Sequence, residues 1–333
     1  MRGETQDPDR AFEDSLRPAS FDDFVGQKSV IRNLTVYVRA ARERKEPLDH
    51  ALFTGMPGLG KTTLARIIAH EMKARLHVTS GPVLKRPGDL AGMLTKLQPG
   101  DVLFIDEIHR ILADVEEYLY SAMEQFFISI PVESGPNGRT INLPLKRFTL
   151  VGATTREGLL SKPFHDRFKI REKLDFYPVD DLVKILSRSA RLLSIGLEPD
   201  ACRMIGDRSR GTPRIANNHL RRVRDLAQVR GSKAISIRLA EEGLAMLGVD
   251  ALGLEEIDRK ILKVLCGQPE PVGLKTIAAA VGEQEDTIEE VYEPYLLQQG
   301  LLLRTSRGRK ASPLALAHLG ATAKAPPQGS LFK

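Results

Sequence analysis

This sequence contains little sulfur, no tryptophan and no long apolar segment. Among its 333 residues there are 2 cysteines. Cys202 and Cys266 lie far apart, with neither a CxxC spacing nor a neighbouring histidine pair, so we expect two free thiols and neither a zinc site nor a disulfide framework. No apolar run approaches the roughly 20 residues that span a bilayer. We therefore expect neither a membrane protein nor a disulfide-stapled scaffold.

The amino terminus and the net charge give two weaker indications. The first residues, MRGETQD, contain no apolar stretch of the signal-peptide kind, so we expect a cytoplasmic protein without a membrane contact. A formal net charge of +6 weakly favours a polyanionic partner such as nucleic acid. The positions of the basic residues are more informative than their sum.

The pattern of apolar residues divides the chain into three parts. Residues 1–177 alternate short apolar runs with amphipathic stretches, which predicts an α/β domain with a parallel sheet. Strands are expected over residues 50–55, 101–106 and 148–155. Residues 178–250 have helical periodicity, residues 251–320 indicate a helix-turn-helix followed by a basic hairpin, and residues 321–333 form an expected disordered tail.

The segment GMPGLGKT carries the strongest signal for function. It matches the GxxxxGK[ST] pattern, follows an expected strand and precedes a helix-forming run. Backbone N–H groups of such a loop surround phosphates, while Lys61 reaches the β and γ phosphates and Thr62 ligates Mg²⁺. A plain glycine turn would not require lysine and threonine there. The residues expected to bind the nucleotide are Gly55, Gly58, Gly60, Lys61, Thr62 and Thr63.

Two acidic residues follow the next expected strand. Asp106 and Glu107 end the segment DVLFIDE, where the loop after a parallel strand opens toward a ligand. Asp106 is expected to hold Mg²⁺ through water, and Glu107 is expected to orient and polarise the attacking water. The alternative is a helix cap and a first-turn partner of the helix dipole, which the preceding phosphate loop makes weaker.

Four other residues are ambiguous from the sequence alone. Thr154 and Thr155 either offer hydroxyl groups at the same sheet edge or simply favour a strand. Arg214 is expected in the first turn of a helix, where the dipole disfavours a cation unless a phosphate lies nearby; a surface arginine is the alternative. Arg167 could form a surface ion pair, and only the nucleotide of a neighbouring subunit would give it a sharper role.

The basic charge of the third part lies in its hairpin. The second helix of the expected helix-turn-helix, over residues 286–299, carries four acids, which phosphates would repel. The hairpin, with Gly308 expected at its turn, contains the basic residues Arg304, Arg307, Arg309 and Lys310. It predicts salt-sensitive DNA binding that ignores sequence, whereas a solvated basic hairpin is the alternative.

Another hairpin is expected near residues 127–146, where two β-forming segments flank the turn GPNG. Its second strand alternates apolar with polar residues, and the apolar ones are Ile141, Leu143 and Leu145. With no obvious covering element, this face predicts contact with a protein partner. Packing on its own domain is the alternative.

The chain resembles the AAA+ ATPases and, among them, the motors that drive branch migration of Holliday junctions. The segments that carry this resemblance over nearly the whole chain are LRPASFDDFVGQ, PLDHALFTGMPGLGKTTLA, DVLFIDEIHR, FTLVGATTR, SRGTPRIAN, LRRVRD and EPYLLQQGLLLRTSRGR. The resemblance implies an α/β AAA+ P-loop domain, an all-α lid and a C-terminal winged-helix domain, with ATP and Mg²⁺ as cofactors.

The resemblance also implies roles for single residues. Thr155 is similar to sensor 1, Arg214 to sensor 2, and Arg167 to the arginine finger that acts on a neighbour's γ-phosphate. The residues that match the family's adenine-side contacts are Leu16, Arg17, Phe24, Val25 and Tyr177. A finger of this kind implies a homohexameric ring.

The implied partners are duplex DNA of the junction arms, the junction-binding protein RuvA at the 127–146 hairpin, and the RuvC resolvase in the full complex, during recombination and DNA repair. The departures from the family's pattern are Met56, Gln125, Lys169, Asn218 and His219. None removes a catalytic group, although Gln125 and Lys169 lie near the implied subunit interface and bear on coupling.

Two other functions of AAA+ proteins fit the sequence less well. Protein-remodelling rings grip polypeptide with an aromatic pore loop, but the segment SGPVLKRPGDLAGMLTKLQPG between the two nucleotide motifs contains no aromatic residue. ATP-switched DNA binders are the other alternative. The acidic helix disfavours an initiator, and the finger segment DRFKI lacks the Ser-Arg-Cys setting of clamp loaders.

Overall fold

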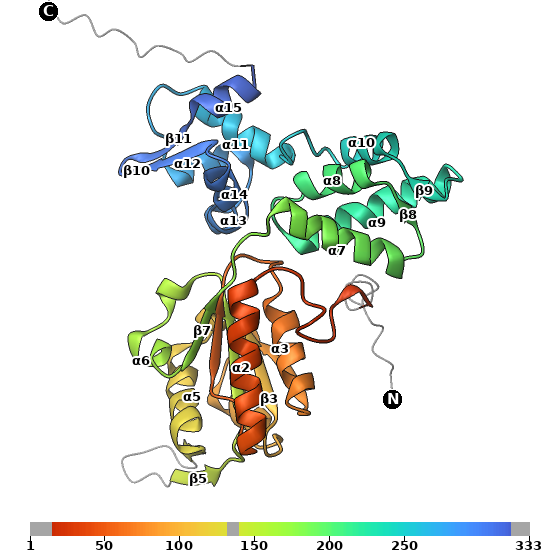
Figure 1. Cartoon of the computed structure of the whole chain (residues 1–333). Helices are drawn as coiled ribbons and strands as arrows, with labels where there is room; N and C mark the ends of the chain where they lie inside the picture. Colours follow the sequence, from red (N-terminus) through yellow and green to blue (C-terminus); the bar gives the residue numbers. More distant parts are fainter. Residues whose placement is uncertain (1–14, 132–139, 321–333) are drawn as a thin grey trace, which may run out of the picture. The chain divides into compact units, whose positions relative to one another are not determined.

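The computed structural model describes residues 15–131 and 140–320 (Figure 1). The expected tail and the GPNG turn lie outside the described residues. The chain forms two compact units, Met1–Tyr177 and Pro178–Lys333. Within the described ranges, no helix has the length and apolar character needed to cross a membrane.

The first unit contains a parallel five-stranded sheet in the order β2-β3-β6-β1-β7. Its strands are β1 (Ala51–Thr54), β2 (Leu76–Ser80), β3 (Val102–Asp106), β6 (Thr149–Thr154) and β7 (Ile170–Lys173). Its helices are α2 (Lys28–Arg44), α3 (Lys61–Glu71), α4 (Pro87–Leu94), α5 (Ala113–Gln125) and α6 (Lys162–His165), with 3-10 turns η1 (Gly81–Val83), η2 (Ile108–Arg110) and η3 (Glu157–Leu159). The predicted α/β domain with a parallel sheet is confirmed.

The three strands expected from the sequence lie in the centre of this sheet. Every residue of β1 and β6 is buried, as are the first four of β3, because helices cover both faces of a parallel sheet. Gly152 of β6 allows η2 to pack closely, since an added Cβ would lie 2.8 Å from Cδ1 of Ile108. The centre of the sheet thereby fixes the loop that follows β3.

The hairpin expected near residues 127–146 consists of β4 (Phe127–Pro131) and β5 (Thr140–Pro144). The strands are antiparallel, and Ile128 lies opposite Leu143. Ile128 is fully buried, Leu143 is half-buried and Ile141 is 50% exposed. The apolar face of the hairpin is therefore continuous with the core at its base and reaches solvent near the start of β5.

The first part of the second unit is the predicted helical domain. Its helices are α7 (Val179–Leu192), α8 (Pro199–Asp207), α9 (Pro213–Val229) and α10 (Ile237–Met246). The structure adds a short parallel pair that the periodicity did not predict, β8 (Gly196–Leu197) with β9 (Ala234–Ile235). The free thiol of Cys202 is buried in α8.

The rest of this unit is a winged helix. It comprises α11 (Glu256–Cys266), α12 (Leu274–Val281), α13 (Glu285–Thr287), the π-helical turn η4 (Ile288–Tyr292), α14 (Glu293–Gln298), β10 (Leu302–Thr305), β11 (Gly308–Ala311) and α15 (Pro313–His318). The expected 286–299 helix is thus widened in its middle, just before Pro294, which has no N–H to donate. Cys266 is a partly buried free thiol.

The wing differs from its prediction in one detail. The turn of the β10–β11 hairpin is formed by Ser306 and Arg307, and Gly308 is the first residue of β11. Gly308 has a φ of +141°, and an added Cβ would lie 2.4 Å from the carbonyl oxygen of Val272. Val272 also pairs with Arg309 as an isolated bridge. Glycine is required there because a third chain segment packs against the wing.

His219 of α9 makes the stability of the protein sensitive to acid. The side chain is 4% exposed, and burial, followed by the charge of Arg210, lowers its pKa from 6.5 to about 4. An unfolded chain would take up a proton near pH 6.5, while the folded chain does so only near pH 4. The stability associated with neutral His219 is therefore complete above the higher pKa and is lost as the pH falls toward the lower one.

We expect His219→Leu to remove this acid-dependent loss. At pH 5 the free energy of unfolding of the variant, relative to its own value at pH 7.5, should fall by about 2 kcal/mol less than that of the wild type. Urea unfolding at both pH values measures the difference. An equal loss in both proteins would mean that His219 takes up its proton in the folded state as readily as in the unfolded chain.

Candidate functional site

The phosphate loop joins β1 to α3 at the carboxyl edge of the sheet. Two of its glycines are required by the backbone. Gly55 has a φ of +139°, and an added Cβ would lie 2.5 Å from the carbonyl oxygen of Leu174. Gly60 has a φ of +108° and is the N-cap of α3, so it turns the chain into the helix N-terminus. Phosphates bind favourably at such a helix end.

Lys61 is the buried cation of this loop. Its side-chain ammonium donates to the carbonyl oxygens of Gly55 at 2.6 Å and Met56 at 2.8 Å. The residue is 8% exposed, and burial lowers its pKa to about 8, although the charge of Asp106 raises it in part. An ammonium held by neutral carbonyls in a buried position gains from a phosphate anion. The donor set fits the phosphates of ATP.

The residues expected on the adenine side of the nucleotide come from two segments, one before β1 and one after β7 in the chain. Tyr177 donates its hydroxyl hydrogen to the carbonyl oxygen of Leu59 at 3.1 Å. An added Cβ on Gly60 would lie 3.0 Å from Cζ of Phe24 and 3.8 Å from the Tyr177 hydroxyl. The rings of Phe24 and Tyr177 therefore meet the same end of the phosphate loop.

Two more of these residues are anchored nearby. A guanidinium nitrogen of Arg17 donates to the hydroxyl of Thr63 at 3.4 Å. Leu16 is 4% exposed, and Val25 is half-buried next to Phe24. The fold thus brings the segment around residues 16–25 to the first turn of α3.

Asp106 and Glu107 end β3 at the same edge of the sheet. An Asp106 carboxylate oxygen accepts from the backbone N–H of Glu107 at 2.9 Å. Glu107 has a φ of +47°, an uncommon conformation for a residue with a side chain, and its carboxylate accepts from Arg110 at 3.0 Å. A hydroxyl and one carboxylate, completed by waters and phosphates, suit Mg²⁺, so Thr62 and Asp106 fit that ion.

His109 distinguishes the two threonines at the end of β6, Thr154 as its last residue and Thr155 just after it. The Thr154 hydroxyl lies 2.9 Å from Nδ1 of His109 and accepts from the backbone N–H of Arg156 at 2.9 Å. Thr154 is 1% exposed, whereas Thr155 is half-buried at the bend after the strand. The hydroxyl of Thr154 is used inside the protein, which leaves Thr155 as the better candidate to face a ligand.

Three family models match consecutive parts of the chain. They are the Holliday junction DNA helicase RuvB P-loop domain over residues 16–174, the RuvB AAA lid domain over residues 177–250, and the RuvB C-terminal winged helix domain over residues 251–320. The chain belongs to the RuvB family. It is accordingly a P-loop ATPase that binds ATP.

Relatives from distant organisms match over almost their full length. The Holliday junction branch migration complex subunit RuvB of Myxococcus xanthus is 56% identical over 97% of this chain and 95% of that protein. The subunit of the same name from Methanoregula boonei is 56% identical over 94% of each. The structure of the Thermotoga maritima RuvB Holliday junction branch migration motor is 48% identical, covers 94% of this chain and 100% of that one, and has a TM-score of 0.85.

The arginine that resembles the RuvB finger is held by its own subunit. Arg167 follows α6, and its guanidinium donates to the carbonyl oxygen of Pro163 at 2.6 Å. It forms an ion pair with Glu124 at 3.2 Å and lies 4.5 Å from the ring centroid of Tyr120. Because the side chain is still 22% exposed, it is positioned but not enclosed.

The helix that carries Arg214 begins where the sequence predicts. Thr212 is the N-cap of α9, Pro213 is the first helical residue, and the exposed Arg214 lies in the first turn. The Thr212 hydroxyl does not cap the helix, however. It donates to the carbonyl oxygen of Arg210 at 3.1 Å, so it fixes the turn before the helix instead.

In the wing of this RuvB-family chain, the four basic residues expected to bind DNA have different surroundings. Glu293 of α14 is 1% exposed and forms ion pairs with both Arg304 and Arg309, the latter at 2.6 Å. Glu289 also pairs with both, at 2.8 and 3.4 Å. Burial alone would raise the pKa of Glu293, but hydrogen bonds from Arg309 and Arg304 outweigh it and hold the pKa below its usual value.

Two of the four basic wing residues therefore fasten the hairpin to the acidic helix. Arg309 is only 16% exposed. Arg307 and Lys310 are exposed, and neither forms an ion pair with any residue that the structure describes. The acidic residues were expected to repel DNA, yet two of them serve mainly to neutralise and position the wing.

Some apolar residues of the hairpin near residues 127–146 also contact their own domain, whereas others reach solvent. Leu145 is half-buried and packs against the core cluster of the first unit, and its backbone N–H donates to Phe126 at 2.7 Å. It anchors the hairpin to its own domain. Ile141 is 50% exposed and Leu143 is half-buried, so both reach solvent.

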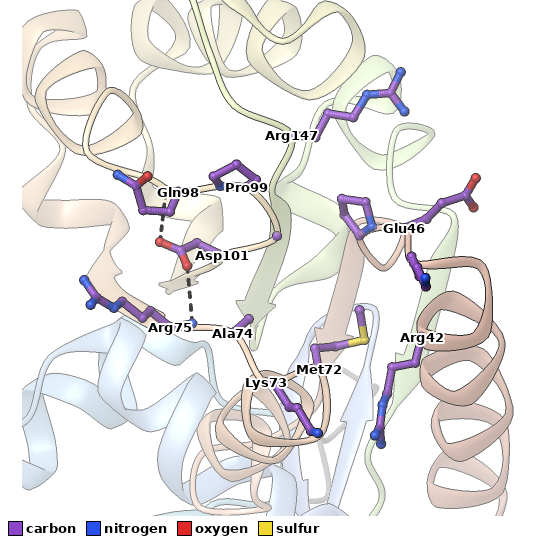
Figure 2. Close-up of a pocket in the computed structure, with 13 residues that line it drawn as sticks. Arg42, Glu46, Met72, Lys73, Ala74, Arg75, Gln98, Pro99, Asp101 and Arg147 are labelled. Atoms are coloured by element: carbon purple, nitrogen blue, oxygen red, sulfur yellow. Dashed lines mark hydrogen bonds between the residues drawn. The ribbon is translucent and has the colours of Figure 1, made fainter.

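A hollow of about 930 Å³ lies at the opposite edge of the sheet, among the segments that precede β1, β2, β3 and β6 (Figure 2). Its Asp101 carboxylate accepts from the backbone N–H groups of Gln98 and Arg75 at 3.0 and 3.3 Å. Arg42 lies in the last turn of α2, and Lys73 follows the end of α3. Cations are favoured at the negative carboxyl ends of helices, which gives the positions of Arg42 and Lys73 a structural cause.

We expect Glu107→Gln to keep ATP binding and to lower the hydrolysis rate about 100-fold or more, because the amide cannot polarise the attacking water. Equilibrium binding of fluorescent ATP and steady-state phosphate release measure the two effects. The control is Glu117→Gln, which neutralises an exposed acid of α5. Normal turnover in Glu107→Gln would remove Glu107 from the reaction.

Proposed function

We propose that this chain is an ATP-driven motor that moves duplex DNA and drives branch migration of Holliday junctions. The observation that carries the proposal is the presence, in one RuvB-family chain, of a phosphate loop with a buried lysine and a winged helix whose hairpin carries the exposed basic residues Arg307 and Lys310. A wing that touches phosphates binds DNA without reading its sequence, as a motor on any junction arm requires.

The proposed site divides the work of hydrolysis among named residues. Lys61 and Thr62 hold the phosphates and Mg²⁺, with Asp106 as the second anchor of the ion. Mg²⁺ neutralises phosphate charge when it is bound. The Glu107 carboxylate gives up its contact with Arg110 and orients the attacking water. Thr155 contacts the γ-phosphate as sensor 1. Arg214, as sensor 2, would bring α9 toward the nucleotide.

The proposed assembly is a homohexamer in the cytoplasm in which Arg167 of each subunit acts on the nucleotide of its neighbour. The guanidinium of Arg167 is positioned by its own subunit while the side chain stays 22% exposed, which supports this role. RuvA is proposed to contact Ile141 and Leu143 on the hairpin, and RuvC to join the full complex. Arg307 and Lys310 are the proposed DNA contacts, with Arg304 and Arg309 as their support.

Mixed rings test whether Arg167 acts between subunits. Arg167→Ala and Glu107→Gln should each be nearly inactive alone. In an equal mixture, about one quarter of the sites combine an intact Glu107 with a neighbour's intact Arg167, so about that share of hydrolysis should return. Phosphate release after subunit exchange measures it. A mixture no more active than its components would exclude a finger that acts in trans.

The wing is tested by the salt dependence of DNA binding. Arg307→Ala and Lys310→Ala should each reduce the slope of log K against log salt by about 1, equally for unrelated sequences. Lys263→Ala, an exposed lysine of α11, is the control for the lost charge. Arg304→Ala should instead destabilise the winged helix, because it leaves buried Glu293 with one partner fewer. An unchanged slope in the first two variants would remove the wing from the DNA contact.

The proposed function itself is tested by ATP hydrolysis with and without a synthetic four-way junction and RuvA, while junction dissociation is followed in the same tube. We expect strong stimulation and dissociation in the wild type and neither in Glu107→Gln. Hydrolysis that responds to neither addition would favour a remodelling or switching ATPase.

A further inference from the structure

One buried arginine connects the helical domain to the winged helix inside the second unit. Arg210 lies between α8 and α9, is 5% exposed and has a φ of +53°. Few residues with a side chain adopt this left-handed conformation, so the surrounding contacts must hold it. It stands two residues before the N-cap of α9 and is not part of the nucleotide or DNA site described above.

The side chain of Arg210 contacts three separate elements of the winged-helix part. Its Nε donates to the carbonyl oxygen of Gly253 at 2.9 Å, in the connection between α10 and α11. Its guanidinium forms ion pairs with Asp258 of α11 and, at 3.4 Å, with Glu255. The guanidinium carbon also lies 5.3 Å from the ring centroid of Tyr295 in α14.

The connection between α10 and α11, which Arg210 contacts, is itself held on two sides. The Tyr295 hydroxyl donates to the carbonyl oxygen of Leu252 at 2.7 Å. Gly253 has a φ of +72°, and an added Cβ would lie 2.8 Å from the carbonyl oxygen of Arg208. The chain between the two domains therefore packs against the backbone of the helical domain on one side and α14 on the other.

The ion pair between Arg210 and Asp258 is enclosed, and the second carboxylate oxygen of Asp258 has no hydrogen-bond partner among the described residues. Asp258 is 0% exposed and accepts from the backbone N–H of Glu255 at 2.7 Å in addition to Arg210. Removal of either partner of such a pair leaves an uncompensated buried charge. Lysine cannot replace Arg210 fully, because it lacks the planar fork that serves several acceptors at once.

The joint is continuous with the helix that carries the proposed sensor 2. The carbonyl oxygen of Arg210 accepts from the Thr212 hydroxyl at 3.1 Å, and the backbone N–H of Thr212 donates to Ser209 at 2.9 Å. Arg214 follows in the first turn of α9. The backbone between Arg210 and Arg214 thus has little freedom to absorb a displacement.

We infer that Arg210 is a positioning residue that makes the winged helix move with α9 as one body. A shift of Arg214 on nucleotide binding or release then moves α11, α14 and the wing that α14 supports. This inference rests on the proposed function, since it assigns to Arg210 the step between ATP hydrolysis and DNA movement. Arg210 itself touches neither nucleotide nor DNA.

The test compares Arg210→Lys and Asp258→Asn with the control Arg203→Lys, an α8 arginine that pairs with Asp180 inside the helical domain. ATP hydrolysis without DNA should stay within about twofold of wild type in all three. The number of junctions dissociated per ATP hydrolysed should fall about fivefold or more in the two joint variants only. This ratio separates a loss of coupling from a general loss of stability.

Hydrogen exchange shows in the same variants whether the joint has opened. The backbone N–H groups of Leu252 and Leu254 donate to Asp250 at 2.9 Å each, and their exchange should become faster while that of α8 stays unchanged. Faster exchange with an unchanged number of junctions dissociated per ATP would show that Arg210 only stabilises the unit. Unchanged exchange with an unchanged number of junctions per ATP would show that Arg210 does not hold the two domains together. Either result overturns the inference.

A milder variant covers the case in which the charged variants do not fold. Tyr295→Phe removes only the hydrogen bond to Leu252, and the same ratio should fall in the same direction by a smaller factor. A Tyr295→Phe protein with faster exchange at Leu252 and a wild-type ratio would overturn the inference. Failure of the wild type to dissociate junctions would instead contradict the proposed function.

Discussion

The rest of the first unit depends on one constraint, the burial of the Lys61 ammonium against carbonyl oxygens of its own loop. That position requires the positive φ of Gly55 and the turn at Gly60, and it requires a parallel sheet whose carboxyl edge opens at β1 and β3 together. Because burial lowers the pKa of Lys61 to about 8, the positive charge of this side chain is costly, and a bound phosphate would relieve that cost. ATP binding therefore supplies the anion that balances the buried ammonium of Lys61.

In the second unit, buried charges are balanced by ion pairs between carboxylates and arginines of the chain itself. Glu293 is buried and takes two wing arginines, while Asp258 is buried and takes Arg210. Each pair joins different elements, neighbouring ones in the wing and, for Arg210 and Asp258, elements 48 residues apart, since a buried charge is tolerated only where a partner lies next to it. The wing is consequently a supported structure, and its free charge is concentrated at Arg307 and Lys310.

The sequence predicted the parts that have continuous local patterns. The phosphate loop and strands β1, β3 and β6 combine apolar runs with a fixed motif, whereas β2 and β7 were missed because they lie at the sheet edges and alternate with polar residues. The contact between His109 and Thr154 and the pairing of Arg309 with Glu293 join residues 45 and 16 positions apart. Residue type alone shows that a charge is present, and only the fold shows whether another residue neutralises it.

The arrangement around α5 indicates how the hairpin and the proposed finger are related. Tyr120 and Glu124 of this helix hold Arg167. The helix ends at Gln125, and the carbonyl oxygen of its C-cap, Phe126, accepts from Leu145 at the base of the hairpin. A helix transmits displacement along its axis because its backbone hydrogen bonds keep its length fixed. The surface proposed for RuvA and the residue proposed to act on the neighbouring nucleotide are thus attached to the same rigid element. Gln125 lies between the two attachments.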